Sequence, residues 1–378
     1  MRRVKFEDVA TRVNTREDKD NTSLLYYVGG DHIESGELVV HNKGLIAGST
    51  IGPMFYFGFK KGDILLVSRN PHLRKAAMVT FDGICSEKTF VIGTKDENVL
   101  LQKYLAVIVQ SNSFWDYCEE HKSGGVNFFV NWSTLAKYEF DLPDIEEQAR
   151  ISERVWSAYY VKESYRRLIS ATDELVKSRF IEELYTRFPK QKLGEHITVV
   201  RGVSYKPSDV RDSDSLSPTA IILRSNNIAE GEINFDDLVY VVKERVQKEQ
   251  ELQAGDIVMC GSNGSISLVG KAGLLKTDRP NISFGAFCLG IKCKDTVLPE
   301  YLNTYFNTPV YREEIESMGN GTNIINIRPN NITNLMIPIP SLHEQRSFVG
   351  FVRQADKSKF ELKQAIEKID KVMRSLLQ

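Results

Sequence analysis

The feature that most constrains this chain is an internal repeat. Leu-Pro-Asp-Ile-Glu-Glu-Gln-Ala-Arg (142–150) is matched by Ile-Pro-Ser-Leu-His-Glu-Gln-Arg-Ser (339–347). The proline, second glutamate and glutamine of the first segment recur 197 positions later (345 minus 148). Two copies of one unit can present two similar surfaces related by an approximate twofold axis, and duplex DNA has an approximate dyad of its own.

Other landmarks recur in the same order. Gly-Asp-Ile occurs at Gly62 and at Gly255, 193 positions apart (255 minus 62), and Tyr-Leu occurs at Tyr104 and at Tyr301. Both Gly-Asp-Ile segments open short apolar runs that are typical of β-strands. The predicted fold class is α+β, with two similar globular domains separated by two long helices that pair as an antiparallel coiled coil. The expected ranges are 1–143 and 189–340 for the domains, and 144–188 and 341–378 for the helices.

Both helices have recognisable starts, because Asp144 and Ser341 stand at N-cap positions with a glutamate three residues later. Each then carries one apolar stripe at 4,3 spacing, and Lys162 and Lys359 interrupt both stripes at the same step. Such a lysine either fixes the register of the pair or lays its aliphatic stem along the seam. The alternative to pairing is that each helix lies on its own domain. The predicted seam consists of Ile151, Val155, Tyr165, Ile169, Val176, Phe348, Val352, Leu362, Ile366, Ile369 and Met373.

Composition narrows the classes of function. The net charge of −1 gives no support for a generally basic surface, so any nucleic-acid site must be local. The five cysteines form no CxxC pair, which favours reduced thiols in a cytoplasmic protein. We expect no signal peptide and no membrane span. The scattered histidines and the absence of a phosphate loop predict no catalytic centre, no metal and no cofactor.

Polar loops lie at similar points of both halves, and their side chains are of the kind that reads base edges. Asparagine can bond adenine through two hydrogen bonds, and arginine can bond guanine in the same way. For any single residue an ordinary turn role is the stronger interpretation, whereas the shared placement favours a binding edge. The candidate DNA-binding residues are Arg69, Asn70, His72, Lys122, Asn127, Arg224, Asn226, Asn227, Ser262, Asn263, Asn320, Thr322 and Asn323.

Together these segments resemble the specificity subunit of type I restriction–modification enzymes. The most specific part is the duplicated proline–glutamate–glutamine segment that leads into each long helix; Val-Gly-Lys-Ala-Gly (269–273) is also similar to a recurrent family feature. The resemblance implies a non-catalytic subunit that binds double-stranded DNA, with one half of a split target for each domain. It also implies two methyltransferase (modification) subunits as partners, and restriction subunits that join through the complex.

Recognition domains of this family differ greatly between members, so the resemblance transfers no base contact. Two other functions remain open. One is a coiled-coil scaffold that joins two protein-binding domains, and the other is the recognition subunit of a methylation-only or type II system.

Overall fold

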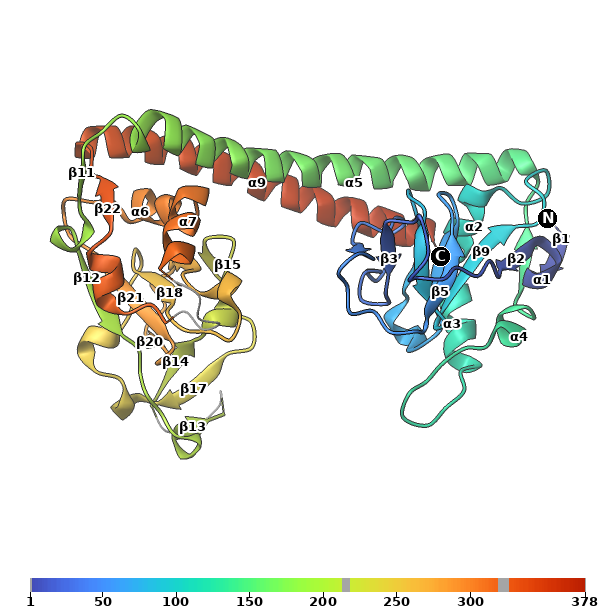
Figure 1. Cartoon of the computed structure of the whole chain (residues 1–378), viewed down its shortest axis with the longest axis horizontal. Coiled ribbons are helices and arrows are strands. Elements are labelled where there is room, and N and C mark those ends of the chain that lie inside the picture. Colours follow the sequence, from blue (N-terminus) through green and yellow to red (C-terminus); the bar gives the residue numbers. More distant parts are fainter. Residues whose placement is uncertain (1, 213–217, 319–325, 378) are drawn as a thin grey trace. The chain divides into compact units, whose positions relative to one another are not determined.

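The computed structural model describes residues 2–212, 218–318 and 326–377. They form two compact units, one of Met1–Arg166 with Lys363–Gln378 and one of Arg167–Leu362. Each unit contains one globular domain and a stretch of both long helices, α5 (Ile145–Phe180) and α9 (Leu342–Leu376) (Figure 1). Within the described residues, no helix is long and apolar enough to cross a membrane.

The first domain is built on two four-stranded sheets. In sheet order, the first consists of β2 (Ala10–Val13), β9 (Thr89–Thr94), β6 (Ile64–Val67) and β7 (Ala76–Met78), and the second of β4 (Gly44–Leu45), β3 (Tyr26–Val28), β8 (Gly83–Ser86) and β5 (Phe55–Phe59). The other elements are β1 (Arg2–Lys5), which pairs with β10 (Glu139–Leu142), and the helices α1 (Phe6–Val9), η1 (Pro71–Leu73), α2 (Gln102–Ile108), α3 (Asn112–Glu120) and α4 (Trp132–Leu135).

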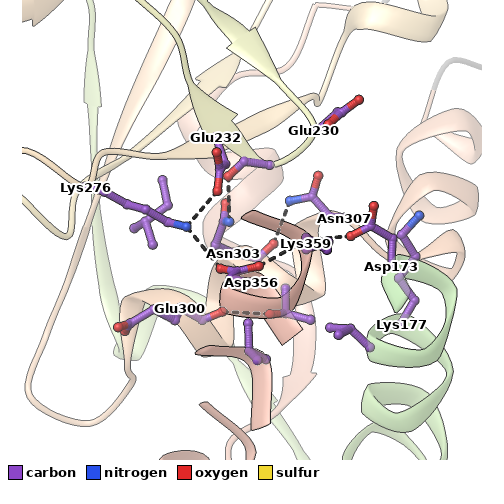
Figure 2. Close-up of a pocket in the computed structure, with 15 residues that line it drawn as sticks. Asp173, Lys177, Glu230, Glu232, Lys276, Glu300, Asn303, Asn307, Asp356 and Lys359 are labelled. Atoms are coloured by element: carbon purple, nitrogen blue, oxygen red, sulfur yellow. Dashed lines mark hydrogen bonds and ion pairs between the residues drawn. The ribbon is translucent and has the colours of Figure 1, made fainter. Parts of the chain in front are cut away.

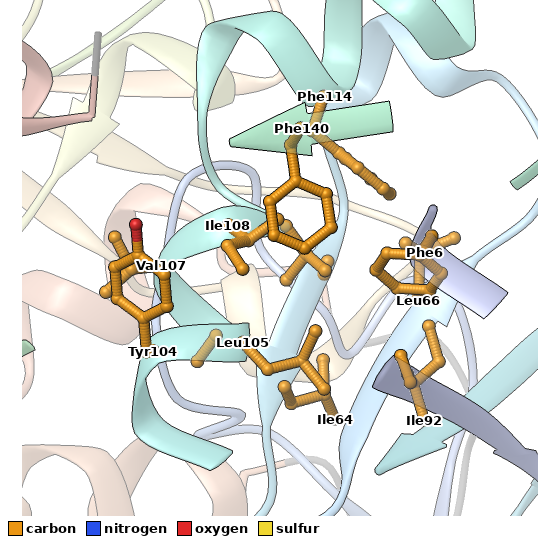
Figure 3. Close-up of a cluster of buried hydrophobic side chains, with 14 of the residues drawn as sticks. Phe6, Ile64, Leu66, Ile92, Tyr104, Leu105, Val107, Ile108, Phe114 and Phe140 are labelled. Carbon is orange, nitrogen blue, oxygen red and sulfur yellow. The ribbon is translucent and has the colours of Figure 1, made fainter. Parts of the chain in front are cut away.

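Strand β6 is buried on both faces. Successive side chains of a strand point to opposite sides, so its residues enter two different cores. Ile64 and Leu66 enter a core formed with α1, α2 and α3, which Figure 3 shows around Phe6 and Phe114. Leu65 points into a second core under β3 and β5. The apolar run after Gly62 is therefore a β-strand, as the sequence predicted, and it lies at an inner position of its sheet.

The second domain repeats this plan. Its first sheet has the order β12 (Ile197–Arg201), β21 (Cys288–Cys293), β18 (Ile257–Cys260), β19 (Ala272–Leu274), β16 (Glu232–Ile233) and β15 (Ile228–Ala229), and its second has the order β13 (Val210–Arg211), β17 (Val239–Val242), β14 (Thr219–Leu223) and β20 (Ile282–Phe284). The remaining elements are β11 (Lys190–Lys192), which pairs with β22 (Met336–Pro338), the α-helices α6 (Pro299–Phe306), α7 (Pro309–Ser317) and α8 (Pro329–Thr333), and the short helices η3 (Leu193–Glu195), η4 (Pro207–Asp209), η5 (Ser225–Asn227), η6 (Lys243–Arg245), η7 (Lys248–Gln250) and η8 (Ile266–Leu268).

The two domains agree in detail. Strands β12, β21, β18 and β19 follow one another as β2, β9, β6 and β7 do, and both second sheets contain one parallel pair, β3 with β8 and β14 with β20. The α+β class and the internal repeat are confirmed.

Gln148 anchors the start of α5 to the first domain. Its side chain is fully buried; its Oε1 accepts from the backbone N–H of Leu101 at 3.0 Å, and its Nε2 donates to the carbonyls of Val99 and Pro143, both at 2.9 Å. Asp144 caps the same helix by accepting from the N–H of Glu147 at 2.9 Å.

Gln345 anchors α9 to the second domain in the same way. It is also fully buried; its Oε1 accepts from the N–H of Leu298 at 2.8 Å, and its Nε2 donates to the carbonyls of Thr296 at 3.0 Å and Pro340 at 2.9 Å. A chain that folds this unit twice needs this glutamine twice, which explains why the motif recurs.

Helices α5 and α9 contact each other in antiparallel directions. In the second unit, Phe180 packs edge-on against Phe348 with ring centroids 5.5 Å apart, and Asp173 pairs with Lys359 at 2.6 Å. Thus residue numbers rise along one helix as they fall along the other. In the first unit Lys162 pairs with Asp370 at 2.7 Å. The antiparallel pairing expected from the stripes is confirmed.

The seam is shared with the domains. Val155 and Met373 lie in the core of the first domain, and Phe348 lies in that of the second. The alternative of helices on their own domains therefore holds only for the first turns of each helix, because the end of α9 packs in the first domain and the end of α5, at Phe180, packs in the second. The other predicted seam residues, Ile151, Tyr165, Ile169, Val176, Val352, Leu362, Ile366 and Ile369, are half-buried. The α-helical part of α5 ends at Phe180. One π-helical turn, η2 (Ile181–Tyr185), follows it, and the first long helix was expected to extend to 188.

Candidate nucleic-acid interface

In the first domain, the loop after strand β6 meets two other segments. Ser68 donates its N–H and its hydroxyl to the carbonyl of Lys88, both at 2.8 Å, in the turn between β8 and β9. The carbonyl of Ser68 accepts from the N–H of Val130 at 2.8 Å. The loop after β6, the β8–β9 turn and the segment before α4 therefore converge.

The second domain builds the same junction from equivalent positions. The carbonyl of Phe287, in the turn between β20 and β21, accepts from the N–H groups of Gly261 at 2.8 Å and Ser262 at 3.0 Å. The carbonyl of Gly261 accepts from Ile327 at 2.8 Å. Because identical backbone bonds recur, the polar loops of the two domains occupy matching places.

Candidate residues of the first domain gather at its junction. Arg69 is exposed and forms a β-bridge with Phe129, while the N–H of Asn70 donates to the carbonyl of Phe128 at 2.8 Å. Asn70 has a φ of 51°, a left-handed conformation that asparagine tolerates better than most residues. His72 follows in η1 and is exposed.

Lys122 and Asn127 lie in the loop that Phe128 and Phe129 close. Asn127 is exposed, whereas Lys122 is half-buried, pairs with Glu119 at 2.7 Å and has its ammonium 4.4 Å from the ring centre of Phe128. The structure thus brings four candidates, Arg69, Asn70, Lys122 and Asn127, onto two neighbouring loops.

In the second domain an open cavity of about 1090 Å³ lies at the junction. The candidates Arg224, Asn226, Ser262 and Asn263 line it, together with Tyr205 and Phe287 among others. The Asn263 amide donates to the Ser225 hydroxyl at 3.2 Å, which ties the loop after β18 to η5.

Arg224 is partly neutralised. Its guanidinium pairs with the Asp237 carboxylate at 2.7 Å, and the Asn226 amide donates to the same carboxylate at 3.1 Å. Arg224 is half-buried, but the Asp237 carboxylate is largely exposed, so water weakens this attraction and an anionic ligand can compete for the cation.

Asn227 has a structural role instead. It is 0 % exposed, its amide donates to the carbonyl of Asp236 at 2.7 Å, and its Oδ1 accepts from the N–H of Arg224 at 2.9 Å. Because the Asn227 side chain is buried and makes its hydrogen bonds within the domain, it is not available to a DNA ligand. Asn320, Thr322 and Asn323 lie outside the described residues.

A second pair of equivalent sites lies where α5 and α9 meet each domain. In the first unit Lys162 is buried and pairs with Glu37 at 2.9 Å as well as with Asp370, and Arg166 pairs with Glu37 at 2.8 Å. Burial alone would raise the pKa of Glu37, but hydrogen bonds from Arg166 and Lys162 outweigh it and lower that pKa.

In the second unit Lys359 pairs with Asp173 at 2.6 Å and with Asp356 at 3.0 Å, and Lys276 pairs with Asp356 at 3.1 Å (Figure 2). Burial would lower the pKa of Lys359, yet hydrogen bonds to Asp173 and Asp356 raise it. The lysines that interrupt the stripes therefore make specific ion pairs across the helix pair.

The two clusters line cavities of about 330 Å³ and 230 Å³. Five lining positions match at the 197-residue offset of the repeat: Lys162 and Lys359, Asp370 and Asp173, Gln110 and Asn307, Met373 and Val176, and Arg374 and Lys177. Two pairs are identical, and the other three keep an amide, an apolar or a basic side chain. The chain therefore carries the same ion-pair site twice, once in each unit.

In the first unit, the side chains of Glu37, His41 and Glu163 each offer an atom that could bind a metal ion, and these atoms lie within 4.8 Å of one another. Lys162 and Arg166 already neutralise Glu37, so an ion-pair network accounts for this cluster without a metal.

Sequence reasoning missed the acidic partners of the seam lysines and the β20–β21 turn. The offset was a usable signal for Asp173 and Asp370, which stand 197 positions apart (370 minus 173). No local pattern marks Phe287.

Comparisons with known proteins agree with these features. No protein-family model matches the chain. It is 34% identical over 186 residues to the type I restriction enzyme StySPI specificity subunit of Salmonella potsdam, a match covering 48% of this chain and 39% of that protein. It is 35% identical over 151 residues to the EcoKI specificity subunit of Escherichia coli (strain K12), covering 39% of this chain and 32% of that one. The matched regions are thus less than half of each relative.

The fold has a solved counterpart. A chain from a structural study of complex assembly and conformational transition in a type I R-M system superposes with a TM-score of 0.57 at 17% identity, covering 100% of this chain and 96% of that one. At this identity the likeness establishes the fold, and the curated relatives add the link in sequence. Over the matched regions this chain is similar in sequence to specificity subunits of type I restriction enzymes, and it shares its fold with a chain of a type I R-M system.

Proposed function

We propose that this chain is the DNA sequence-specificity subunit of a type I restriction–modification complex. Each globular domain reads one half of a bipartite target through the loop after its central strand. The observation that carries the proposal is the duplicated junction, in which the same backbone bonds hold polar loops in both domains. A DNA target made of two half-sites requires two similar DNA-binding surfaces on one chain.

The chain provides recognition and no chemistry. Methyl transfer and cleavage, with their cofactors, belong to partner subunits, and the complex works in the cytoplasm. Two modification subunits bind one chain, because the matched clusters around Lys162 and Lys359 give two copies of one partner equivalent surfaces. Restriction subunits join through the complex.

The near-zero charge fits a shared DNA interface. The chain carries 49 basic and 50 acidic residues, and Arg224 is paired with Asp237. Neutralisation of backbone phosphates, which makes binding salt-dependent, then comes largely from the modification subunits.

The test is to produce the full chain with its modification subunits and to map methylated adenines on genomic DNA. We expect one bipartite motif with a fixed spacer. Arg69→Ala should relax or weaken only one half-site, and Asn263→Ala only the other, each by about 1–3 kcal/mol for a lost base contact. No sequence-specific methylation, with normal complex assembly, would sink the proposal and favour a scaffold of two protein-binding domains. The same motif from a chain whose neighbouring genes encode no separate restriction subunit would favour a methylation-only or type II system.

A further inference from the structure

Phe287 is a large apolar side chain held in the open by a rigid turn. The side chain is 72% exposed, between β20 and β21. The N–H of Cys288 closes the turn on the carbonyl of Gly285 at 2.8 Å, and the carbonyl of Phe287 accepts from two N–H groups of the loop after β18. The ring is therefore presented from fixed backbone.

The same position of the first domain carries a different residue. There the β8–β9 turn places Lys88, whose carbonyl accepts from Ser68 as that of Phe287 accepts from Gly261. Lys88 pairs with Glu87 at the surface. Since the turn forms equally well around a lysine, the fold does not need an aromatic ring at this point.

The surroundings of Phe287 identify the kind of partner. The cavity beside it offers another aromatic ring, Tyr205, and the hydrogen-bonding groups of Asn226, Ser262 and Asn263. Base pairs present this mixture in the major groove, where amides bond donors and acceptors and an apolar side chain contacts the C5 methyl of thymine. A lysine at the equivalent point lacks an apolar surface of that shape.

We propose that Phe287 is a specificity-determining residue that contacts the C5 methyl group of one thymine in the half-site read by the second domain. The inference rests on the proposed function. It makes the two domains chemically unequal, with an apolar reader in the second and a charged residue at the matching place in the first.

The experiment uses the full chain assembled with its modification subunits and duplexes that contain the mapped target. Each thymine of both half-sites is replaced singly by uracil, which lacks only the C5 methyl group. Wild type should lose affinity roughly threefold to tenfold at one thymine, the range expected for one buried methyl group. Phe287→Ala should bind the unmodified duplex more weakly by a similar factor and should no longer distinguish uracil from thymine there.

Two further variants serve as controls. Phe287→Leu keeps an apolar surface and should retain part of the discrimination, while Lys88→Ala should leave it intact. Unchanged thermal unfolding of Phe287→Ala would show that the exposed ring is not needed for folding.

The outcomes separate the two proposals. Failure of the wild-type complex to bind any sequence selectively overturns the proposed function. Selective binding without a uracil-sensitive thymine, or sensitivity that survives in Phe287→Ala, overturns only the assignment of Phe287.

Discussion

Replacing Gln148 with alanine should detach the start of α5 from the first domain while leaving the second domain unaffected. The side chain is fully buried and makes three hydrogen bonds, one to an N–H and two to carbonyls. A typical hydrogen bond contributes about 0.5–1.5 kcal/mol net, and a buried group left without a partner costs about 1–3 kcal/mol. With some entry of water, we expect a loss of about 2–4 kcal/mol.

Hydrogen exchange followed by mass spectrometry in increasing urea can resolve the two units. Gln148→Ala should speed exchange in α2, α5 and the first domain, and Gln345→Ala should do so in α6, α9 and the second domain by a similar free energy. Ser157→Ala, at an exposed position of α5, is the control and should change little.

A loss below about 1 kcal/mol would mean that water replaces these bonds at little cost. An equal loss in both domains from one substitution would refute the reasoning in another way, because it would show that the domains do not unfold separately.

Three further predictions concern the seam. Lys359→Asp should destabilise the second unit, and adding Asp173→Lys should recover about 1 kcal/mol as coupling energy in a double-mutant cycle by urea unfolding. Because the pKa of Glu37 is lowered on folding, its contribution to stability is present above the reference pKa of 4.5 and is lost as the pH falls below it; Glu37→Gln should flatten that part of the stability profile of the first unit. A fragment of residues 1–188 should form an antiparallel homodimer at micromolar concentration, since Lys162 of one copy would face Asp173 of the other; light scattering that finds only monomer contradicts this. Asp173 stands 197 positions before Asp370, the partner of Lys162 in the intact chain (370 minus 173).

The sequence by itself determined the features that depend on neighbours along the chain. The caps at Asp144 and Ser341, the 4,3 stripes and the strands after Gly62 and Gly255 follow from local rules, and the repeat fixed the two-domain plan. The family resemblance came from the same repeated segments.

The tertiary structure decided which distant groups meet. Asn227 and Asn226 are adjacent in the sequence, yet only the fold shows that Asn227 is buried and hydrogen-bonded within the domain. Likewise Lys162 could fix register or cover the seam until Glu37 and Asp370 were placed beside it. Burial and ion pairing depend on contacts between residues far apart in the chain, which periodicity cannot specify; for that reason the exposed ring of Phe287 also became visible only in the folded domain.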